Sequence, residues 1–310
     1  MNHWAEALKT ILPVMLVVCI GMLCRAKKLI TREGIDTLKK VAVNICLPAV
    51  LFRAFANTSY GIQDLLIPLA MFGVCALAWY LGRIGARLLR MRSRFIPFLT
   101  TGFEAGMLGY ALFEMLYGAE QVEQFARIDL GQVLFVFTLY KVLLGLSGGQ
   151  KADRKALIRD MAASPIIVAI LAGVALGATG LYQKDFMRGV SGVLNECATL
   201  VAAPTSVLIL LCIGYDLVLR DTPWRETLRA AALRVAVMLP LCCAFLLALR
   251  LLYPAHTMHR AIYVMFILPP PFVLPVFADD ARQRTFVSAV LYVSTLIAIA
   301  GFCALAILRL

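Results

Sequence analysis

Charged side chains are scarce in this chain. Only 15% of its 310 residues are charged, whereas soluble proteins have about 25%. Apolar residues make up 62%, and the mean hydropathy is +0.86. No soluble core could enclose so much apolar surface. Apolar runs of about 20 residues, the length that spans a bilayer as a helix, recur along the chain. The sequence therefore predicts an all-α membrane protein.

Several catalytic and nucleotide-binding patterns are also missing. There are three histidines, none of them inside an apolar run, and no H-E-x-x-H, G-x-S-x-G or P-loop motif occurs. We therefore expect no enzyme activity, no catalytic residue, no metal and no cofactor. The net charge of +12 would suggest nucleic acid in a soluble protein. Here the basic residues lie between apolar runs, so we expect the lipid bilayer and no nucleic acid as a partner.

Charge clusters divide the chain into ten candidate spans. The only long polar segment is GGQKADRKALIRDMAAS, at residues 148–164, and it falls at the midpoint. We predict a first half of five spans at 1–147, a cytoplasmic linker at 148–164 and a second half of five spans at 165–310. The spans are predicted at residues 7–24, 38–55, 65–88, 95–117, 130–147, 165–182, 189–213, 228–250, 260–278 and 285–308.

The basic residues indicate the orientation. The loops after spans 1, 3, 5, 7 and 9 hold 21 Lys and Arg, while the termini and the other loops hold 8. Arg83 and Arg234, at span ends, are counted with the first group. Basic loops stay in the cytoplasm. We therefore predict a multi-pass protein of the inner cell membrane with both termini outside.

Five spans per half means that the second half enters the membrane from the opposite side. Such inverted repeats are typical of secondary transporters. A weak sequence echo agrees with this arrangement, because Gly21 follows Pro13 by eight residues and Gly173 follows Pro165 by the same distance.

Transporters of this kind bind substrate where helices are interrupted near the midplane. Span 4 contains TTGFEAGMLGYALF, with Gly102, Gly106 and Gly109, and glycine lets a chain bend or another backbone approach. Its counterpart, span 9, contains FILPPPFVLPVFADD, and prolines cannot continue a helix. We predict that spans 4 and 9 are crossed broken helices, with site residues Gly106, Gly109, Pro269, Pro270 and Pro271. The alternative is that the glycines only form a small-residue packing face between helices.

Milder breaks are predicted in spans 2 and 7. Pro48 would free a backbone carbonyl near Asn44, and Pro204, just before Thr205, would do the same in span 7. Asn44 offers both a donor and an acceptor. We include Asn44, Pro48 and Thr205 among the candidate substrate- or ion-binding residues. The alternative for Asn44 is an interhelical hydrogen bond that only holds the bundle together.

These segments resemble the auxin efflux carrier family in bacterial form, and the resemblance covers essentially the whole chain. It rests on IGMLCRAKKLI at the end of span 1, VNICLPA in span 2, LFEMLYG at the end of span 4, and AAPTSVLILLCIGYDL in span 7. Sodium-coupled bile acid symporters are similar in architecture and form the alternative.

The resemblance implies two inverted five-helix repeats, an elevator-like transport cycle, small organic anions as substrates and a homodimer. This sequence departs from the family pattern in span 4. Glu104 stands at the family's asparagine and Ala111 at its crossover proline.

Glu104 is the carboxylate that most needs an explanation. An isolated charge at the bilayer centre costs about 2.5–3.5 kcal/mol on insertion scales, so it persists when it is paired, protonated or hydrated. Lys141 in span 5 is predicted at a similar depth and could pair with it. We hypothesise that Glu104 couples transport to protons, with Lys141 as its partner or as the anchor of an anionic substrate. Asp129 and Arg53, near span ends, are explained by snorkelling or loop solvation.

The sequence thus predicts a secondary active transporter of a small organic solute, a carboxylate or other organic anion, coupled to protons through Glu104. Sodium coupling remains an alternative, since unwound carbonyls and Asn44 could coordinate the ion. A membrane channel or sensor without concentrative transport is the second alternative.

Overall fold

The computed structural model describes residues 3–58, 66–147, 164–180, 182, 188–216, 223–252, 258–272, 274–278 and 281–308. Within these ranges the regular secondary structure is entirely helical. The predicted linker 148–164, apart from Ser164, lies outside the described residues.

Each half contains several helices, some of them short. The first half comprises α1 (His3–Ala26), α2 (Arg32–Val41), η1 (Ala42–Cys46), α3 (Leu47–Ala56), α4 (Leu66–Leu88), α5 (Ile96–Leu99), η3 (Ala105–Gly109), α6 (Tyr110–Tyr117), η4 (Ala119–Gln121), α7 (Val122–Phe135), η5 (Val136–Tyr140) and α8 (Lys141–Ser147). The second comprises α10 (Pro165–Thr179), α11 (Arg188–Ala202), α12 (Thr205–Asp216), α13 (Trp224–Leu252), α14 (His259–Ile267), η8 (Leu274–Phe277) and α15 (Ala281–Leu308).

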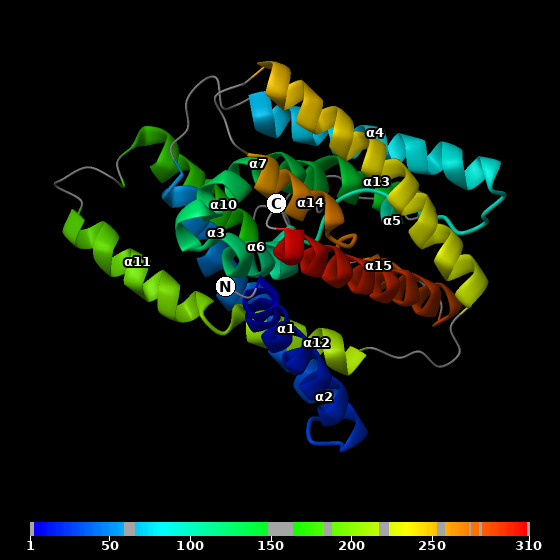
Figure 1. Ribbon diagram of the computed structural model, residues 1–310, viewed down its shortest axis with the longest axis horizontal. Coiled ribbons are helices and arrows are strands. Elements are labelled where there is room, and N and C mark those ends of the chain that lie inside the picture. Colours follow the sequence, from blue (N-terminus) through cyan, green and yellow to red (C-terminus); the bar gives the residue numbers. More distant parts are fainter. Residues whose placement is uncertain are drawn as a thin grey trace.

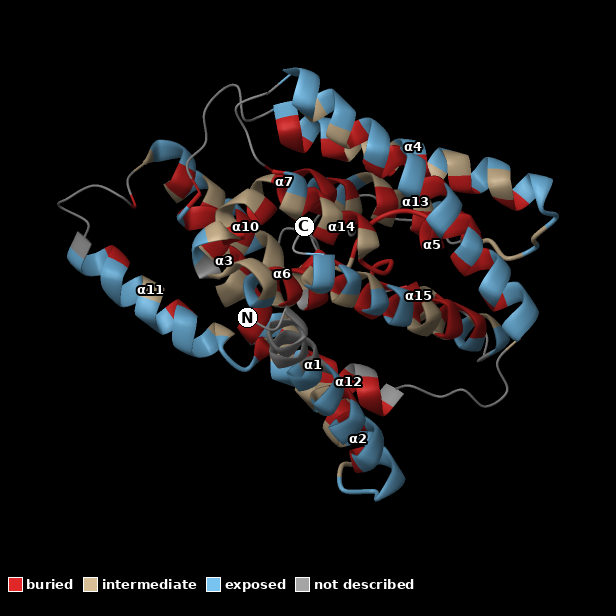
Figure 2. Cartoon of the chain, in the orientation of Figure 1, coloured by how far each residue is buried: buried red, intermediate tan, exposed pale blue. Residues whose placement is uncertain are grey.

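The outer surfaces of these helices are apolar. Leu69 on α4, Leu200 on α11 and Leu239 on α13 are all exposed, and Figure 2 shows how much of these helices faces outward. Exposed apolar surface on this scale requires a hydrocarbon environment. Among the described residues, five helical stretches are long and apolar enough to cross a membrane: Leu66–Leu88, Val122–Ser147, Gly189–Cys212, Trp224–Leu252 and Arg282–Leu308. The chain is an all-helical membrane protein. The predicted total of ten spans depends in addition on the shorter and broken helices.

Several helix contacts come in pairs that are related by exchanging the two halves of the chain. α1 packs on α12 and α10 packs on α3, while α4 packs on α5 and α7 and α13 packs on α14 and α15. Exchanging each helix for its counterpart in the other half reproduces the same contacts. This pattern favours the predicted repeat, with α1, α3, α4, α5 and α7 corresponding to α10, α12, α13, α14 and α15.

The helices form two bundles, each of which draws on both halves of the chain. Bundle A contains α1, α2, α3, α10, α11 and α12, and bundle B contains α4 to α8 and α13 to α15. In Figure 1, bundle A occupies the left and lower part of the view, and α4, α13 and α15 of bundle B extend to the right. Contacts of α1 with α15 and of α3 with α7 connect the two bundles.

Glycines allow close helix packing inside bundle A. A Cβ added at Gly21 of α1 would collide with the backbone carbonyl of Leu211 in α12. A Cβ added at Gly173 of α10 would lie 2.9 Å from the carbonyl oxygen of Phe52 in α3. The two glycines of the sequence echo therefore have equivalent roles in the two helix pairs, which explains why both are glycine.

Spans 4 and 9 are both interrupted, as predicted. Span 4 leaves its helix after α5, and Gly102 has a left-handed φ of +67° that favours glycine. Span 9 leaves its helix at Leu268, directly before the three prolines. The two interrupted segments meet, since the Glu104 N–H donates to the Pro269 carbonyl at 2.9 Å. The glycine packing face that was the alternative does not apply to Gly102, which is outside any helix.

A buried arginine holds the two interruptions together. Arg234 of α13 is 4% exposed. Its Nη1 donates to the carbonyl of Leu99 at 3.1 Å, and its Nη2 donates to those of Gly102 and Leu268 at 2.9 and 2.8 Å. Leu99 ends α5, and Leu268 follows the last residue of α14. The guanidinium thus satisfies carbonyls that the broken helices leave without intrahelical partners, at the negative ends of two helix dipoles.

The sequence-based placement of Arg234 at a span end beside a cytoplasmic loop is therefore wrong. Its side chain lies inside the bundle because it has carbonyl acceptors there, and the charge asymmetry of the loops does not depend on it.

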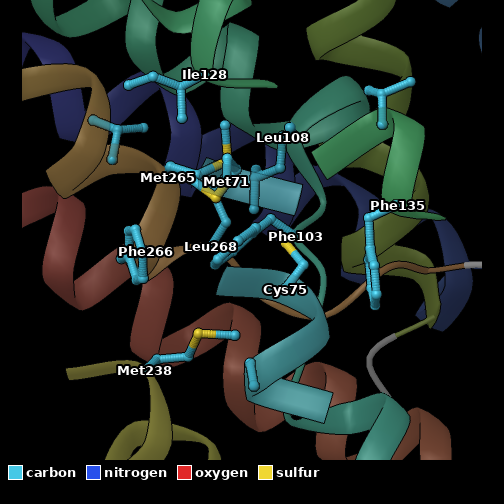
Figure 3. Close-up of a cluster of buried hydrophobic side chains, with 14 of the residues drawn as sticks. Met71, Cys75, Phe103, Leu108, Ile128, Phe135, Met238, Met265, Phe266 and Leu268 are labelled. Atoms are coloured by element: carbon cyan, nitrogen blue, oxygen red, sulfur yellow. The ribbon is translucent and has the colours of Figure 1, made fainter. Parts of the chain in front are cut away.

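Arg234 and the three carbonyls that accept from it are called the Arg234 clamp below. The main apolar core lies around this clamp. Figure 3 shows buried side chains converging from separate elements of bundle B, among them Met71 of α4, Phe103 of the span 4 interruption, Met238 of α13 and Met265 of α14. The interrupted backbone is thus enclosed by protein, as a non-helical segment at membrane depth requires.

Replacing Gly21 by Ala tests the close packing of α1 on α12. We expect a loss of about 1–3 kcal/mol in the free energy of unfolding, because the added methyl group has no space. Thermal melting of the purified protein in detergent measures the change. Gly73→Ala on α4 is the control, since its added Cβ would have no atom within 4 Å. Equal melting temperatures for the two variants would contradict the packing argument.

Replacing Arg234 by Met tests the clamp. Three buried carbonyls would lose their donors, at about 1–3 kcal/mol each, so we expect a destabilisation of at least ~3 kcal/mol in thermal melting. Arg234→Lys should be intermediate, because an ammonium lacks the fork of the guanidinium. Arg229→Met, at an exposed position of the same helix, is the control and should melt like the wild type. A stable Arg234→Met variant would contradict the role of the clamp.

Candidate substrate-binding site

A cavity of about 680 Å³ lies between the two bundles. Bundle A contributes residues of α2, η1, α3, α10 and α12, and bundle B contributes the two interruptions together with α7, η5, α8 and α15. Sites for small organic ligands typically have volumes of about 300–1,000 Å³. The cavity is therefore large enough for such a molecule, and it lies beside the two interrupted segments.

Part of the cavity wall comes from the interruptions themselves. Phe103, Glu104 and Gly106 contribute from span 4, and Pro271 and Phe272 from span 9. The backbone N–H of Phe272 donates to the Glu104 carboxylate through a short hydrogen bond. Glu104 is thus attached to span 9 twice, by its own N–H on Pro269 and by its side chain on Phe272.

One face of the α7–η5–α8 segment provides another wall. Asp129, Gln132, Val136, Tyr140 and Lys141 all line the cavity. The first four are three or four residues apart and so lie along one side of the helix, and Lys141 directly follows Tyr140. Tyr140 also donates to the carbonyl of Phe98 at 3.2 Å, which ties this helix to α5.

Among the charged side chains that line the cavity, the basic ones outnumber the acidic ones. Arg32 and Lys39 of α2 lie 3.6 and 3.9 Å from Asp36, and Arg284 of α15 donates to the Ala278 carbonyl at 3.3 Å. Arg32, Lys39 and Arg284 together with Asp36 carry a net positive charge. Lys141 adds another, and it forms no ion pair with the residues that the structure describes.

The candidate site residues separate into two groups. Glu104, Gly106, Lys141 and Pro271 line the cavity. The others do not contribute to its described lining: Asn44, Pro48, Gly109, Thr205, Pro269 and Pro270.

Each of these others has a different position. Asn44 is exposed in η1. Thr205 begins α12 and donates to the Ala202 carbonyl across the break at Pro204, so it supports that break. Gly109 packs against the side chains of Leu268 and Phe125. A Cβ added at Gly109 would lie 2.7 Å from each of them. Pro269 and Pro270 are buried and shape the interruption of span 9.

Glu104 and Lys141 share the cavity without forming an ion pair with each other in this conformation. The carboxylate turns instead to the Phe272 N–H. Lys141 is therefore available to bind a ligand in the cavity.

The explanation of Asp129 by snorkelling or loop solvation is wrong. Its side chain is 0% exposed and lies in α7, which begins at Val122, eight residues before the predicted start of span 5. A signal was present in the sequence, because Asp129 and Gln132 are three residues apart on the same helical face as Val136 and Tyr140. Arg53, in contrast, is a surface group that lies 3.6 Å from Glu114 and donates to Thr199.

Comparison with known proteins gives one informative match. No protein-family model matches the chain. It is 25% identical over 214 residues to a protein of Methanothermobacter thermautotrophicus that is described as an uncharacterized transporter, and the match covers 67% of each chain.

Proposed function

We propose that this protein is a secondary active transporter of a small organic solute. The observation that carries the proposal is the meeting of two interrupted helices, one from each half, at the wall of a cavity between two bundles. Interrupted helices at a repeat interface are the binding sites of many secondary transporters. The similarity to a protein described as a transporter agrees with it.

The arrangement of the bundles supports an elevator-like cycle. Both interruptions and the Arg234 clamp belong to bundle B, so this part of the cavity would move as a unit. The opposite wall is formed by bundle A. Sliding of bundle B along bundle A would carry a bound solute across the membrane without breaking the contacts between the two interruptions.

A carboxylate-bearing solute suits the charges. Arg32, Lys39 and Arg284 would attract an anion, and Lys141 would bind its carboxylate in the cavity. The apolar residues of the remaining wall, such as Val133 and Phe137, would contact its hydrocarbon part.

Protons are the better coupling ion for this geometry. Carbonyls at helix interruptions coordinate sodium in sodium-coupled carriers. Here Leu99, Gly102 and Leu268 instead accept from Arg234, a cation fixed in the protein. Glu104, by contrast, lines the cavity and can exchange a proton with it.

Glu104→Gln tests proton coupling. In proteoliposomes loaded for counterflow and screened with small carboxylates, we expect the wild type to transport one of them faster with an inward proton gradient. The variant should retain exchange but lose this acceleration, because its amide cannot titrate. Glu120→Gln, at an exposed position, is the control. Proton-driven uptake that survives in Glu104→Gln would contradict the role of Glu104.

The same assay of the wild type tests the alternatives to a transporter. Binding without flux would favour a sensor, and non-saturable flux would favour a channel.

Sodium independence is a separate expectation. Replacing external Na⁺ by choline should leave the initial rate of uptake unchanged, because Arg234 already occupies the carbonyls that would hold the ion. A rate that rises with Na⁺ concentration in a saturable manner would show sodium coupling instead.

A further inference from the structure

Asp129 and Gln132 form a buried polar pair inside the membrane helix α7. Their side chains are 0% and 4% exposed, and both residues contribute to the cavity wall. The transport mechanism proposed above uses neither of them. A carboxyl group so deeply buried is costly unless it is paired or neutral, so the hydrogen bonds of the pair decide its state.

These hydrogen bonds are incomplete if Asp129 is ionised. Gln132 Nε2 donates to Asp129 Oδ1 at 3.0 Å. Asp129 Oδ2 and Gln132 Oε1 have no hydrogen-bond partner among the described residues, and Asp129 takes part in no ion pair there. Both unsatisfied atoms are acceptors when the carboxyl is ionised. A buried acceptor without a donor costs about 1–3 kcal/mol, and more for a charged group.

The elements packed against α7 bring no cation to this carboxyl group. Tyr110 of α6 and Cys75 of α4 are titratable neighbours of Asp129, and neither of them is a cation. Arg234 of α13 donates to three carbonyls of the interruptions.

The charged groups of the other packed elements have partners of their own. Arg53 of α3 pairs with Glu114 of α6, and Arg260 of α14 lies over the Tyr117 ring. On α7 itself, Arg127 and Glu123 pair with each other at 2.7 Å.

We propose that Asp129 is a proton-binding site, occupied in this conformation, in which the carboxylic acid and the Gln132 amide form a reciprocal hydrogen-bonded pair. A hydronium ion of the solvent loses one O–H bond and becomes water, and the transferred proton forms the new O–H bond on Oδ2. The new O–H donates to Gln132 Oε1 while Gln132 Nε2 donates to Oδ1. One proton thus removes the buried charge. It also joins the two atoms that had no hydrogen-bond partner, because Oδ2 becomes the donor and Gln132 Oε1 the acceptor of one hydrogen bond.

Two of the three carboxyl groups that line the cavity therefore differ in this proposal, while the third, Asp36, lies beside Arg32 and Lys39. Glu104 accepts the Phe272 N–H and is ionised, whereas Asp129 is a neutral acid paired with Gln132. If the proposed transport function holds, a proton-coupled cycle uses both Asp129 and Glu104. Asp129 releases its proton when the movement of bundle B admits water to the cavity wall, and Glu104 is the ionised carboxylate that receives one.

Infrared spectroscopy of the protein in lipid bilayers tests the occupied proton directly, whether or not the protein transports anything. At neutral pH we expect the carbonyl stretch of a protonated carboxylic acid in the wild type. Asp129→Asn should remove this band, and Glu104→Gln should leave it unchanged. Gln132→Leu should shift it to higher frequency, because the carbonyl Oδ1 loses its donor. Absence of the band in the wild type, or its persistence in Asp129→Asn, would overturn the proposal.

Asp129→Asn also permits a second measurement. Its amide can donate to Gln132 Oε1 and accept from Gln132 Nε2, so it imitates the protonated acid. We expect it to melt within a few degrees of the wild type, whereas Asp129→Ala should melt lower because Gln132 is left unpaired. If Asp129→Asn melts as low as Asp129→Ala, the reciprocal pair is wrong. Loss of solute flux in all variants and in the wild type, with the infrared band present, would refute transport but not the proton site.

Discussion

The hydrogen bonds from Arg234 to three carbonyl oxygens are the interaction on which the site depends. Two helices of bundle B stop inside the membrane, and each stop exposes carbonyls that no helix turn can satisfy. In hydrocarbon such groups are costly. One guanidinium satisfies Leu99, Gly102 and Leu268 together and places its positive charge at the negative ends of both helices. The interruptions can therefore exist without a bound ion, and they form one unit.

Because the interruptions are held by α13, they are free to provide a cavity wall. Glu104 is fixed by backbone contacts on both sides, with Pro269 and with Phe272, and therefore has a defined position at the point where bundle B faces bundle A. The facing wall comes from α2, η1, α3, α10 and α12, and α2 contributes two basic residues to it, Arg32 and Lys39. This division of one cavity between two bundles is the observation on which the proposed sliding cycle rests.

Local chemistry made part of the site predictable. Three consecutive prolines and the glycines of span 4 restrict the backbone within a few residues of themselves, so both interruptions could be located from sequence. Glu104 and Lys141 could also be identified from sequence, because a charged residue in an apolar run needs an explanation. Asn44 and Thr205 were equally noticeable, yet they do not line the cavity, because a polar residue near a break can serve the break alone.

Arg234 and Asp129 show where sequence reasoning fails. Both lie close to predicted span ends, and a charge near a span end is usually solvated. α7 and α13 extend several residues beyond those ends, and that difference places both side chains inside the protein. The partners of Arg234 are more than 30 residues away in sequence, so no local pattern contains them.

The sequence by itself determined the class of molecule and the places where its helices break, because hydropathy and the backbone limits of proline and glycine act locally. Only the tertiary structure decided which polar residues share the cavity and what surrounds each of them. Glu104 accepts from the N–H of Phe272, 168 residues away in the chain, and Asp129 is completely buried. Both surroundings are set by how the helices pack, and no local pattern in the sequence contains that information.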